Sequence, residues 1–231
     1  MIYTKIIDLI DKYYHHKRIS KFCNFYKIKT LVDVGSHKGE FISNFISHLS
    51  IKKVYAFEPQ LDVFKLLKKK FLKNNKIILN NYAISNKTNF KKLKINRLSS
   101  TSSFSRLNKK SKFFKFKNFL IPENNEFSLV KTKTIDKIFK KISLKNSLIK
   151  IDVEGHEWEV LQGAKKSLKN FSLIIIEKQI FNLYKGNNFK KIHSFLIKNN
   201  FILLKKFRFP SLHFEDRLYL NKKNSMTKSL N

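Results

Sequence analysis

Short apolar runs alternate with helix-like stretches along this chain, and that alternation restricts its fold more than any other feature. The apolar runs have the length of buried strands, whereas the stretches between them repeat large apolar residues every three or four positions, as amphipathic helices do. The predicted strands are 29–34, 53–57, 77–79, 127–133, 147–152 and 173–177, and the predicted helices are 38–49, 61–71, 134–139, 157–168 and 189–198. Strands that alternate with helices form β-α-β units and a parallel sheet, so the expected class is α/β. Residues 201–207 and 216–220 are predicted to form a closing hairpin.

The segments outside this pattern differ in composition. Residues 1–29 carry apolar residues along one stripe and are predicted to be an N-terminal helical segment, and residues 222–231 a polar tail. Residues 85–126 are rich in Ser, Lys, Asn and Phe, with a strand-like stretch at 90–95 followed by a polar loop. A loop of this length is either functional or mobile, or it is a disordered surface insertion. We therefore predict a single domain over residues 30–221, with 85–126 as its variable region.

The chain is strongly basic, with 49 lysine and arginine residues against 16 acidic residues and a formal net charge of +33. Nearly all of the basic residues are lysine, and they are spread over the whole length. This distribution is typical of compositional drift that leaves a solvated lysine coat on an ordinary enzyme. The alternative is a surface that binds polyanions such as nucleic acid.

Cysteine content and hydropathy exclude several classes of protein. The single cysteine, Cys23, excludes an intramolecular disulfide framework and a zinc site of the CxxC type. The longest purely aliphatic run, 173–176, is far too short to span a bilayer, and Asp8 and Asp11 interrupt the apolar N-terminal pattern. We expect a cytoplasmic protein without a transmembrane segment, with peripheral attachment to a membrane as the alternative.

A glycine-containing turn follows the first predicted strand, in the sequence DVGSHKGE at 33–40. Gly35 allows a sharp turn and a close approach of backbone to a ligand, and Gly39 allows tight packing at the helix start. Glu58 ends the second strand, where its carboxylate would lie beside this turn and accept hydrogen bonds from both hydroxyls of a ribose. Asp33 and Glu58 therefore suggest a nucleoside-containing cofactor. The structural alternative is that Asp33 caps the turn and Glu58 is a surface acid before a proline.

Acidic residues gather after the fifth predicted strand, in the sequence KIDVEGHE at 150–157. Strand alternation places Lys150 and Asp152 on the same side, with Asp152 at the ligand-binding edge of the sheet. Asp152 and His156 could orient and deprotonate a substrate hydroxyl. The carboxylates and the imidazole could also hold a divalent cation, although we assign no metal ligand. The remaining alternative is helix capping with a lysine salt bridge. The adjacent His15 and His16 are predicted to be surface residues.

These residues together resemble the FkbM family of S-adenosylmethionine-dependent methyltransferases. The segments that carry the resemblance occur in the family's order: LVDVGSHKGEF (31–41), VYAFEPQLDVFKLL (54–67), NNYAIS (80–85), TSSF (101–104), VKTKTID (130–136), LIKIDVEGHEWEVLQGAKKSL (148–168) and LIIIE (173–177). They cover about residues 30–180, and the DVEG-containing run is the most specific of them. His37 stands where the family more often has asparagine.

The resemblance implies a Rossmann-like class I methyltransferase fold, with a mostly parallel seven-stranded sheet and helices on both faces. It implies S-adenosyl-L-methionine as cofactor, and transfer of its methyl group to an oxygen. The implied cofactor-binding residues are Asp33, Gly35, Gly39, Glu58, Ala83 and Asp152. Asp152 and His156 are the candidates for orienting or deprotonating the acceptor. The implied acceptor is a sugar hydroxyl in a glycan, a glycolipid or a secondary metabolite.

Two other functions remain open on the same fold. The net charge and the Phe/Lys-rich stretch at 112–119 fit an RNA or DNA methyltransferase, because aromatic side chains among lysines can stack on bases. A non-catalytic module that binds nucleic acid or other partners is the second alternative. The pattern predicts neither the acceptor nor the oligomeric state.

Overall fold

A seven-stranded sheet forms the centre of the molecule, which we describe from a computed structural model for residues 14–97, 99–111, 126–181, 184–185, 188–209 and 214–224. The strand order is β3-β2-β1-β7-β8-β10-β9. The bounds are β1 Thr30–Val34, β2 Lys53–Phe57, β3 Ile77–Asn80, β7 Ser147–Ile151, β8 Leu173–Gln179, β9 Phe201–Arg208 and β10 Phe214–Asn221. Only β10 is antiparallel to both of its neighbours, and the other pairs in the sheet are parallel. The predicted class, the seven-stranded sheet and the closing hairpin are confirmed.

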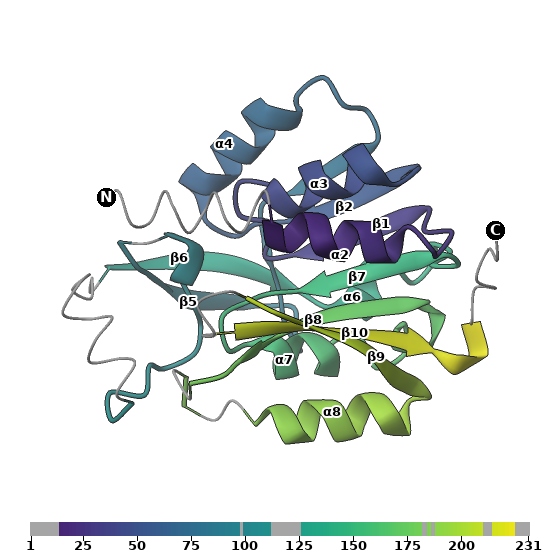
Figure 1. Ribbon diagram of the computed structural model, residues 1–231. Helices are drawn as coiled ribbons and strands as arrows, with labels where there is room; N and C mark the ends of the chain where they lie inside the picture. Colours follow the sequence, from purple (N-terminus) through teal and green to yellow (C-terminus); the bar gives the residue numbers. More distant parts are fainter. Residues whose placement is uncertain are drawn as a thin grey trace.

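Helices cover both faces of this sheet (Figure 1). On one face lie α2 (His16–Cys23), α3 (Glu40–His48) and α4 (Leu61–Phe71), and on the other lie α6 (Ile135–Ile138), α7 (Glu157–Gln162) and α8 (Phe189–Lys198). Each face of the sheet has its own hydrophobic core. Successive residues of a strand contribute to opposite cores, because side chains alternate across a strand. In β1, Leu31 packs with the first set of helices, and Val32 packs with the second. Both side chains are fully buried, as expected of a strand at the centre of a doubly wound sheet.

Three predicted helices are shorter in the structure, and α6 loses only one residue at each end. Gly39 adopts a left-handed conformation with φ of 73°, so α3 begins at Glu40, two residues after the predicted start. The helix predicted over 157–168 ends at Gln162, and Gly163 caps it. Turns and a 3-10 helix, Leu168–Asn170, complete that segment. A 3-10 helix at Lys222–Asn224 begins the predicted tail. Residues 1–13 of the predicted N-terminal helical segment lie outside the described residues, as do residues 225–231.

The predicted variable region builds part of a second, three-stranded sheet. Its strands are β4 (Ala83–Ile84), β5 (Phe90–Ile95) and β6 (Glu126–Lys133), in the order β4-β6-β5. β5 and β6 pair antiparallel, although the intervening chain is long. The segment is therefore not simply a loop: β5 pairs with β6, and a 3-10 helix (Ser99–Thr101) follows β5. Residues 112–125, which include the whole Phe/Lys-rich stretch at 112–119, lie outside the described residues.

The prediction that His15 and His16 are surface residues is wrong. Both are buried where the start of α2 packs against the sheet. His15 Nε2 lies 2.9 Å from Asp216 Oδ2 of β10, and the His16 ring meets Phe41 edge-on. Burial, reinforced by the charge of Lys150, lowers the pKa of His16 to about 3, so this imidazole is neutral in the folded protein. Local sequence gave no sign of the partner because Asp216 is 201 residues away.

No helix in the described ranges is both long enough and apolar enough to cross a bilayer.

Candidate functional site

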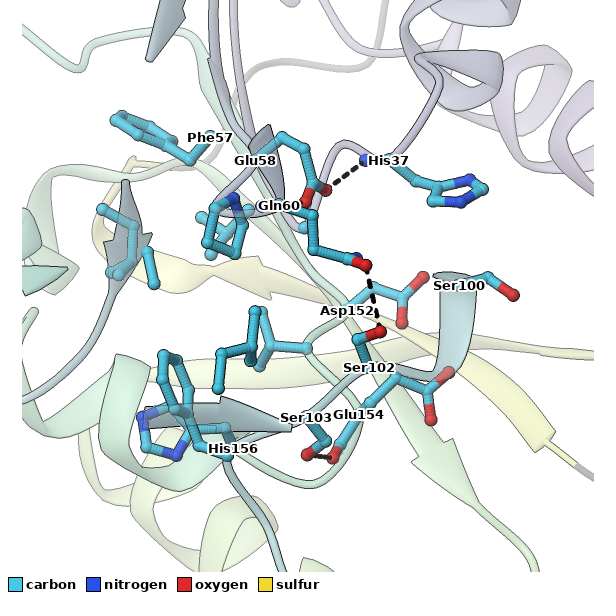
Figure 2. Close-up of a pocket in the computed structure, with 18 of the residues that line it drawn as sticks. His37, Phe57, Glu58, Gln60, Ser100, Ser102, Ser103, Asp152, Glu154 and His156 are labelled. Atoms are coloured by element: carbon cyan, nitrogen blue, oxygen red, sulfur yellow. Dashed lines mark hydrogen bonds between the residues drawn. The ribbon is translucent and has the colours of Figure 1, made fainter. Parts of the chain in front are cut away.

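A pocket opens at the carboxyl ends of β1, β2 and β7 (Figure 2). One wall is the turn after β1, a second is the turn after β2, and a third is the turn between β7 and α7. The three-stranded sheet and the residues after β5 close the remaining side. Sheets of this topology bind ligands at this edge because the connections diverge there.

Gly35 lets the turn after β1 pass the end of β7. Its φ is 86°, and a Cβ at this position would lie 1.9 Å from the backbone carbonyl oxygen of Asp152. No side chain fits in that space without displacement of one of the two strand ends. The turn is also tied to β2, because the backbone N–H groups of Gly35 and Ser36 both donate to the Phe57 carbonyl, at 3.1 and 3.0 Å. These contacts fix the position of the pocket floor.

Glu58 is a buried carboxylate in the pocket wall rather than a surface acid. Only 3% of the residue is exposed. The His37 N–H donates to Oε2 at 2.9 Å, and the Gln60 N–H donates to Oε1 at 2.8 Å (Figure 2). Burial raises the pKa of Glu58 to about 7, although both backbone hydrogen bonds oppose this shift. The carboxylate is therefore held in one orientation beside the glycine turn, with its charge poorly solvated.

A serine-rich segment, residues 99–105, forms the wall that faces Glu58. The Gln60 amide donates to the Ser99 carbonyl at 2.9 Å and accepts from the Ser102 hydroxyl at 3.0 Å. His37 Nε2 lies 2.8 Å from Ser99 Oγ. The Ser105 hydroxyl donates to the Gly155 carbonyl at 2.7 Å. The segment thus connects the turns after β1, β2 and β7 across the pocket.

Lys150 and Asp152 form the most buried ion pair of the site. Lys150 Nζ lies 2.7 Å from Asp152 Oδ2, and the two side chains are 5% and 28% exposed. Burial alone would lower the pKa of Lys150, but the carboxylates of Asp152, Asp33 and Asp216 outweigh that effect and hold it above its usual value. The ammonium therefore stays protonated and fixes the Asp152 carboxylate at the edge of the pocket.

Three carboxylates meet at the ends of β7 and β8. Asp152, Glu154 and Glu177 each offer an oxygen, and these oxygens lie within 4.8 Å of one another. The Tyr184 hydroxyl donates to Glu154 Oε2 at 2.5 Å. Burial, and then the neighbouring Asp152 and Glu154, raise the pKa of Glu177 well above its usual value. A positively charged group or a divalent cation near these oxygens would relieve their repulsion.

His156 is a neutral group fixed by its neighbours. Its Nε2 lies 2.9 Å from Ser85 Oγ, and its Nδ1 lies 3.4 Å from Glu159 Oε2. Burial, reinforced by Lys91, lowers its pKa to about 3. Phe104 covers the ring, with centroids 4.9 Å apart. The imidazole is part of the pocket wall and does not gain a proton near neutral pH.

The structure brings most of the predicted site residues together. Gly35, Glu58, Ala83, Asp152 and His156 line the pocket. Asp33 and Gly39 do not: Asp33 is fully buried on β1 opposite Lys150, and Gly39 packs against Phe71 and Leu67 of α4. Burial raises the pKa of Asp33 to about 6, although Lys150 opposes the shift.

Sequence reasoning missed several lining residues. They are Gln60, the serines of the 99–105 segment and Phe104, and Glu177 of the carboxylate cluster was missed as well. The TSSF segment was the one local signal for the serine wall. Gln60 and Glu177 carry no signal of their own, since each is one of several polar residues at or after the end of a predicted strand.

Comparisons with known proteins agree with this architecture. The model of the methyltransferase FkbM domain matches residues 33–203. No protein of curated function matches the sequence. Among solved structures, methyltransferase FkbM from Methylobacillus flagellatus has a TM-score of 0.56 at 15% identity, over 84% of this chain and 44% of that one. This chain therefore spans less than half of that protein's length.

Two further structures share the fold. M. capricolum TrmK, solved in complex with S-adenosylhomocysteine, has a TM-score of 0.52 at 12% identity, over 90% of this chain and 68% of that one. A protein from Listeria monocytogenes has a TM-score of 0.51 at 10% identity, over 91% and 68% of the two chains. At these identities the likeness concerns the fold alone. The family model, by contrast, matches well over half of the sequence, and the chain belongs to the FkbM family of methyltransferases.

Proposed function

We propose that this chain transfers a methyl group from S-adenosylmethionine to a hydroxyl oxygen, and that the acceptor hydroxyl belongs to a sugar in a glycan, a glycolipid or a secondary metabolite. The observation that carries the proposal is the pocket itself. It contains two carboxylates: Glu58 after β2 is buried and held in one orientation, and Asp152 after β7 is partly exposed at the edge of the pocket.

The lining suits the parts of this cofactor. Glu58 presents a carboxylate to which ribose hydroxyls can donate. Ile84, Leu93 and Phe104 supply apolar surface for an adenine ring. The carboxylates of Asp152 and Glu154 favour a positive charge in the same pocket. The pocket thus contains both the acidic and the apolar groups that a nucleoside with a cationic side chain requires.

The chemistry divides between the cofactor and the chain. When bound, S-adenosylmethionine supplies an activated methyl group on a positively charged sulfur. Asp152 is placed to accept a hydrogen bond from the acceptor hydroxyl, to orient it, and to take up its proton. Lys150 holds that carboxylate in position through the 2.7 Å contact. His156, neutral and bonded to Ser85, keeps the wall of the pocket in place. Alignment of the acceptor oxygen supplies most of the acceleration in this account.

Substitution of Asp152 by asparagine tests this assignment. Asp152→Asn keeps the size of the side chain but removes its basicity, so we expect methyl transfer to fall by about 10²–10⁴-fold. The measurement is transfer of labelled methyl from S-adenosylmethionine to a panel of glycans, glycolipids and sugar-containing metabolites. Cofactor affinity, measured in parallel, should fall by much less than turnover, because Glu154 still favours the positive charge of the cofactor. Full turnover in the variant would refute the role of Asp152, and transfer by the wild type to RNA alone would refute the sugar acceptor.

A further inference from the structure

The outer face of the β5–β6 pair carries an unusual surface. In the antiparallel register Phe90 lies opposite Lys131, Leu129 opposite Lys92, and Phe127 opposite Lys94. Residues directly opposite one another project from the same face of a sheet. Each of the three cross-strand pairs therefore joins one large apolar side chain with one lysine. We call these six residues the Phe/Lys face.

The apolar members of the Phe/Lys face are well exposed. Phe90 is 63% exposed, Phe127 58% and Leu129 66%. The opposite face of the same strands is buried, with Leu93 and Val130 at 3% and 6%. Single exposed apolar residues need no explanation, but three large ones on adjacent positions of one sheet face indicate a contact surface.

We propose that the Phe/Lys face binds the surface of an anionic lipid bilayer. Lysines are attracted to anionic headgroups, and apolar side chains among them can enter the boundary between headgroups and acyl chains. Phenylalanine and leucine are suited to that boundary.

Two observations favour a bilayer over a single-stranded nucleic acid. Leu129 lies between Phe127 and the Phe90–Lys131 pair, and its aliphatic side chain has no π face on which a base could stack. The basic members are all lysine, which interacts with phosphates as a point charge and lacks the planar fork with which arginine reads bases. The face thus combines apolar side chains that can insert with positive charge, and only Phe90 and Phe127 of its six members have a π face.

The Phe/Lys face lies close to the pocket, so that membrane binding would bring the pocket near the bilayer. Leu93, on the inner side of β5, lines the pocket, as does Ala83 of β4. In Figure 1 the β5–β6 pair projects from one side of the main sheet. A bilayer on the outer face would therefore lie one strand layer away from the pocket wall. A bilayer this close to the pocket would suit a sugar acceptor that is attached to a lipid. That use of the binding rests on the proposed function, whereas the binding itself does not.

Vesicle binding tests the proposal without any catalytic assay. The probes are vesicles of phosphatidylglycerol with phosphatidylcholine, and vesicles of phosphatidylcholine alone, in co-sedimentation at moderate salt. The test variant is Phe127→Thr/Leu129→Thr, which leaves the net charge unchanged and keeps residues that favour strands. The matched control is Leu66→Ala/Leu72→Ala, which removes two exposed apolar side chains (53% and 70% exposed) from the lysine-rich surface of α4.

We expect the test variant to bind anionic vesicles about tenfold more weakly than the wild type, and the control to bind about as well as the wild type. Equal binding by all three proteins would overturn the proposal and leave the lysine coat as the cause of attraction. The proposal would also be overturned, in favour of nucleic acid, if the test variant bound a single-stranded oligonucleotide more weakly than the wild type but bound vesicles equally well.

A spectroscopic arm applies even if the double variant fails to fold. Trp158 is the only tryptophan, so Phe127→Trp in a Trp158→Phe background places a single probe on the Phe/Lys face. Anionic vesicles should shift its emission to the blue, and brominated lipids should quench it. Unchanged emission with saturating vesicles would contradict the proposal. Failure of the methyltransferase assay would leave both vesicle results standing, so the two proposals fail separately.

Discussion

Replacing Lys150 with methionine is expected to lower the free energy of unfolding by about 3–5 kcal/mol. The ammonium pairs with Asp152 at 2.7 Å and also interacts with the buried carboxylates of Asp33 and Asp216. Methionine leaves these three carboxylates, of which Asp33 and Asp216 are buried, without the charge of Lys150. Unfolding in urea at neutral pH measures the loss. The deficit should shrink as the pH falls below about 6, because Asp33, whose pKa burial raises to about 6, is then protonated and no longer needs a counter-charge.

A second lysine provides the control for this experiment. Lys65 and Asp62 also form an ion pair, at 3.2 Å, but their side chains are 66% and 95% exposed. Lys65→Met removes the same charge with the same substitution, and we expect no measurable loss of stability because surface pairs contribute little. If Lys150→Met were as stable as Lys65→Met, the buried network would not contribute to the fold in the way that we describe.

Replacing Gly35 with alanine is expected to cost about 3 kcal/mol or more of stability and to weaken cofactor binding. The left-handed backbone disfavours a Cβ, and that atom would also overlap the Asp152 carbonyl oxygen at 1.9 Å. Relief of this overlap requires movement of the turn after β1 or of the end of β7, both of which line the pocket. Chemical unfolding and S-adenosylhomocysteine titration measure the two effects.

Gly39 is the matched control in the same turn. Its φ of 73° is close to the 86° of Gly35, so the conformational cost of alanine is similar at the two positions. Its Cβ would meet the Phe71 and Leu67 side chains, which can rotate away, rather than backbone. We expect Gly39→Ala to lose about 1–2 kcal/mol less stability and to bind cofactor within a few-fold of the wild type. A larger effect at Gly39 than at Gly35 would show that close backbone approach does not shape the pocket.

Local sequence signals were enough to predict the central strands and two walls of the pocket. β1, β2, β7 and β8 are short runs of buried apolar residues, and each wall follows directly from the end of one strand. Gly35 and Glu58 could be placed beside one another because parallel neighbouring strands end at the same edge of the sheet. The Lys150–Asp152 contact followed from strand alternation alone.

The other parts of the site depend on contacts between distant segments. The serine wall reaches the pocket because β5 pairs with β6, and its partner Gln60 is 39 residues from Ser99 in the chain. Glu177 joins Asp152 only through the pairing of β7 with β8. His15 is buried by a contact with Asp216 at the other end of the chain. No periodicity in a single segment can indicate such partners.

Glu58 also gives the cofactor site a predicted pH dependence. Its carboxylate form accepts the ribose hydroxyls in our account, and its pKa in the ligand-free protein is raised to about 7 by burial. About nine-tenths of the group is ionised at pH 8 and about one-tenth at pH 6. Affinity should therefore be about tenfold higher at pH 8 than at pH 6, and Glu58→Gln should remove this dependence.

Calorimetric titration of the protein with S-adenosylmethionine measures whether the pocket beside Glu58 binds this cofactor. Moderate salt keeps the lysine surface from producing non-specific signals. The account predicts saturable binding to the wild type, about 10–100-fold weaker binding by Glu58→Ala, and wild-type affinity in Asp62→Ala, which removes the same charge from an exposed site four residues away. A folded wild-type protein that shows no binding, or a Glu58→Ala variant that binds as tightly as the wild type, would contradict it.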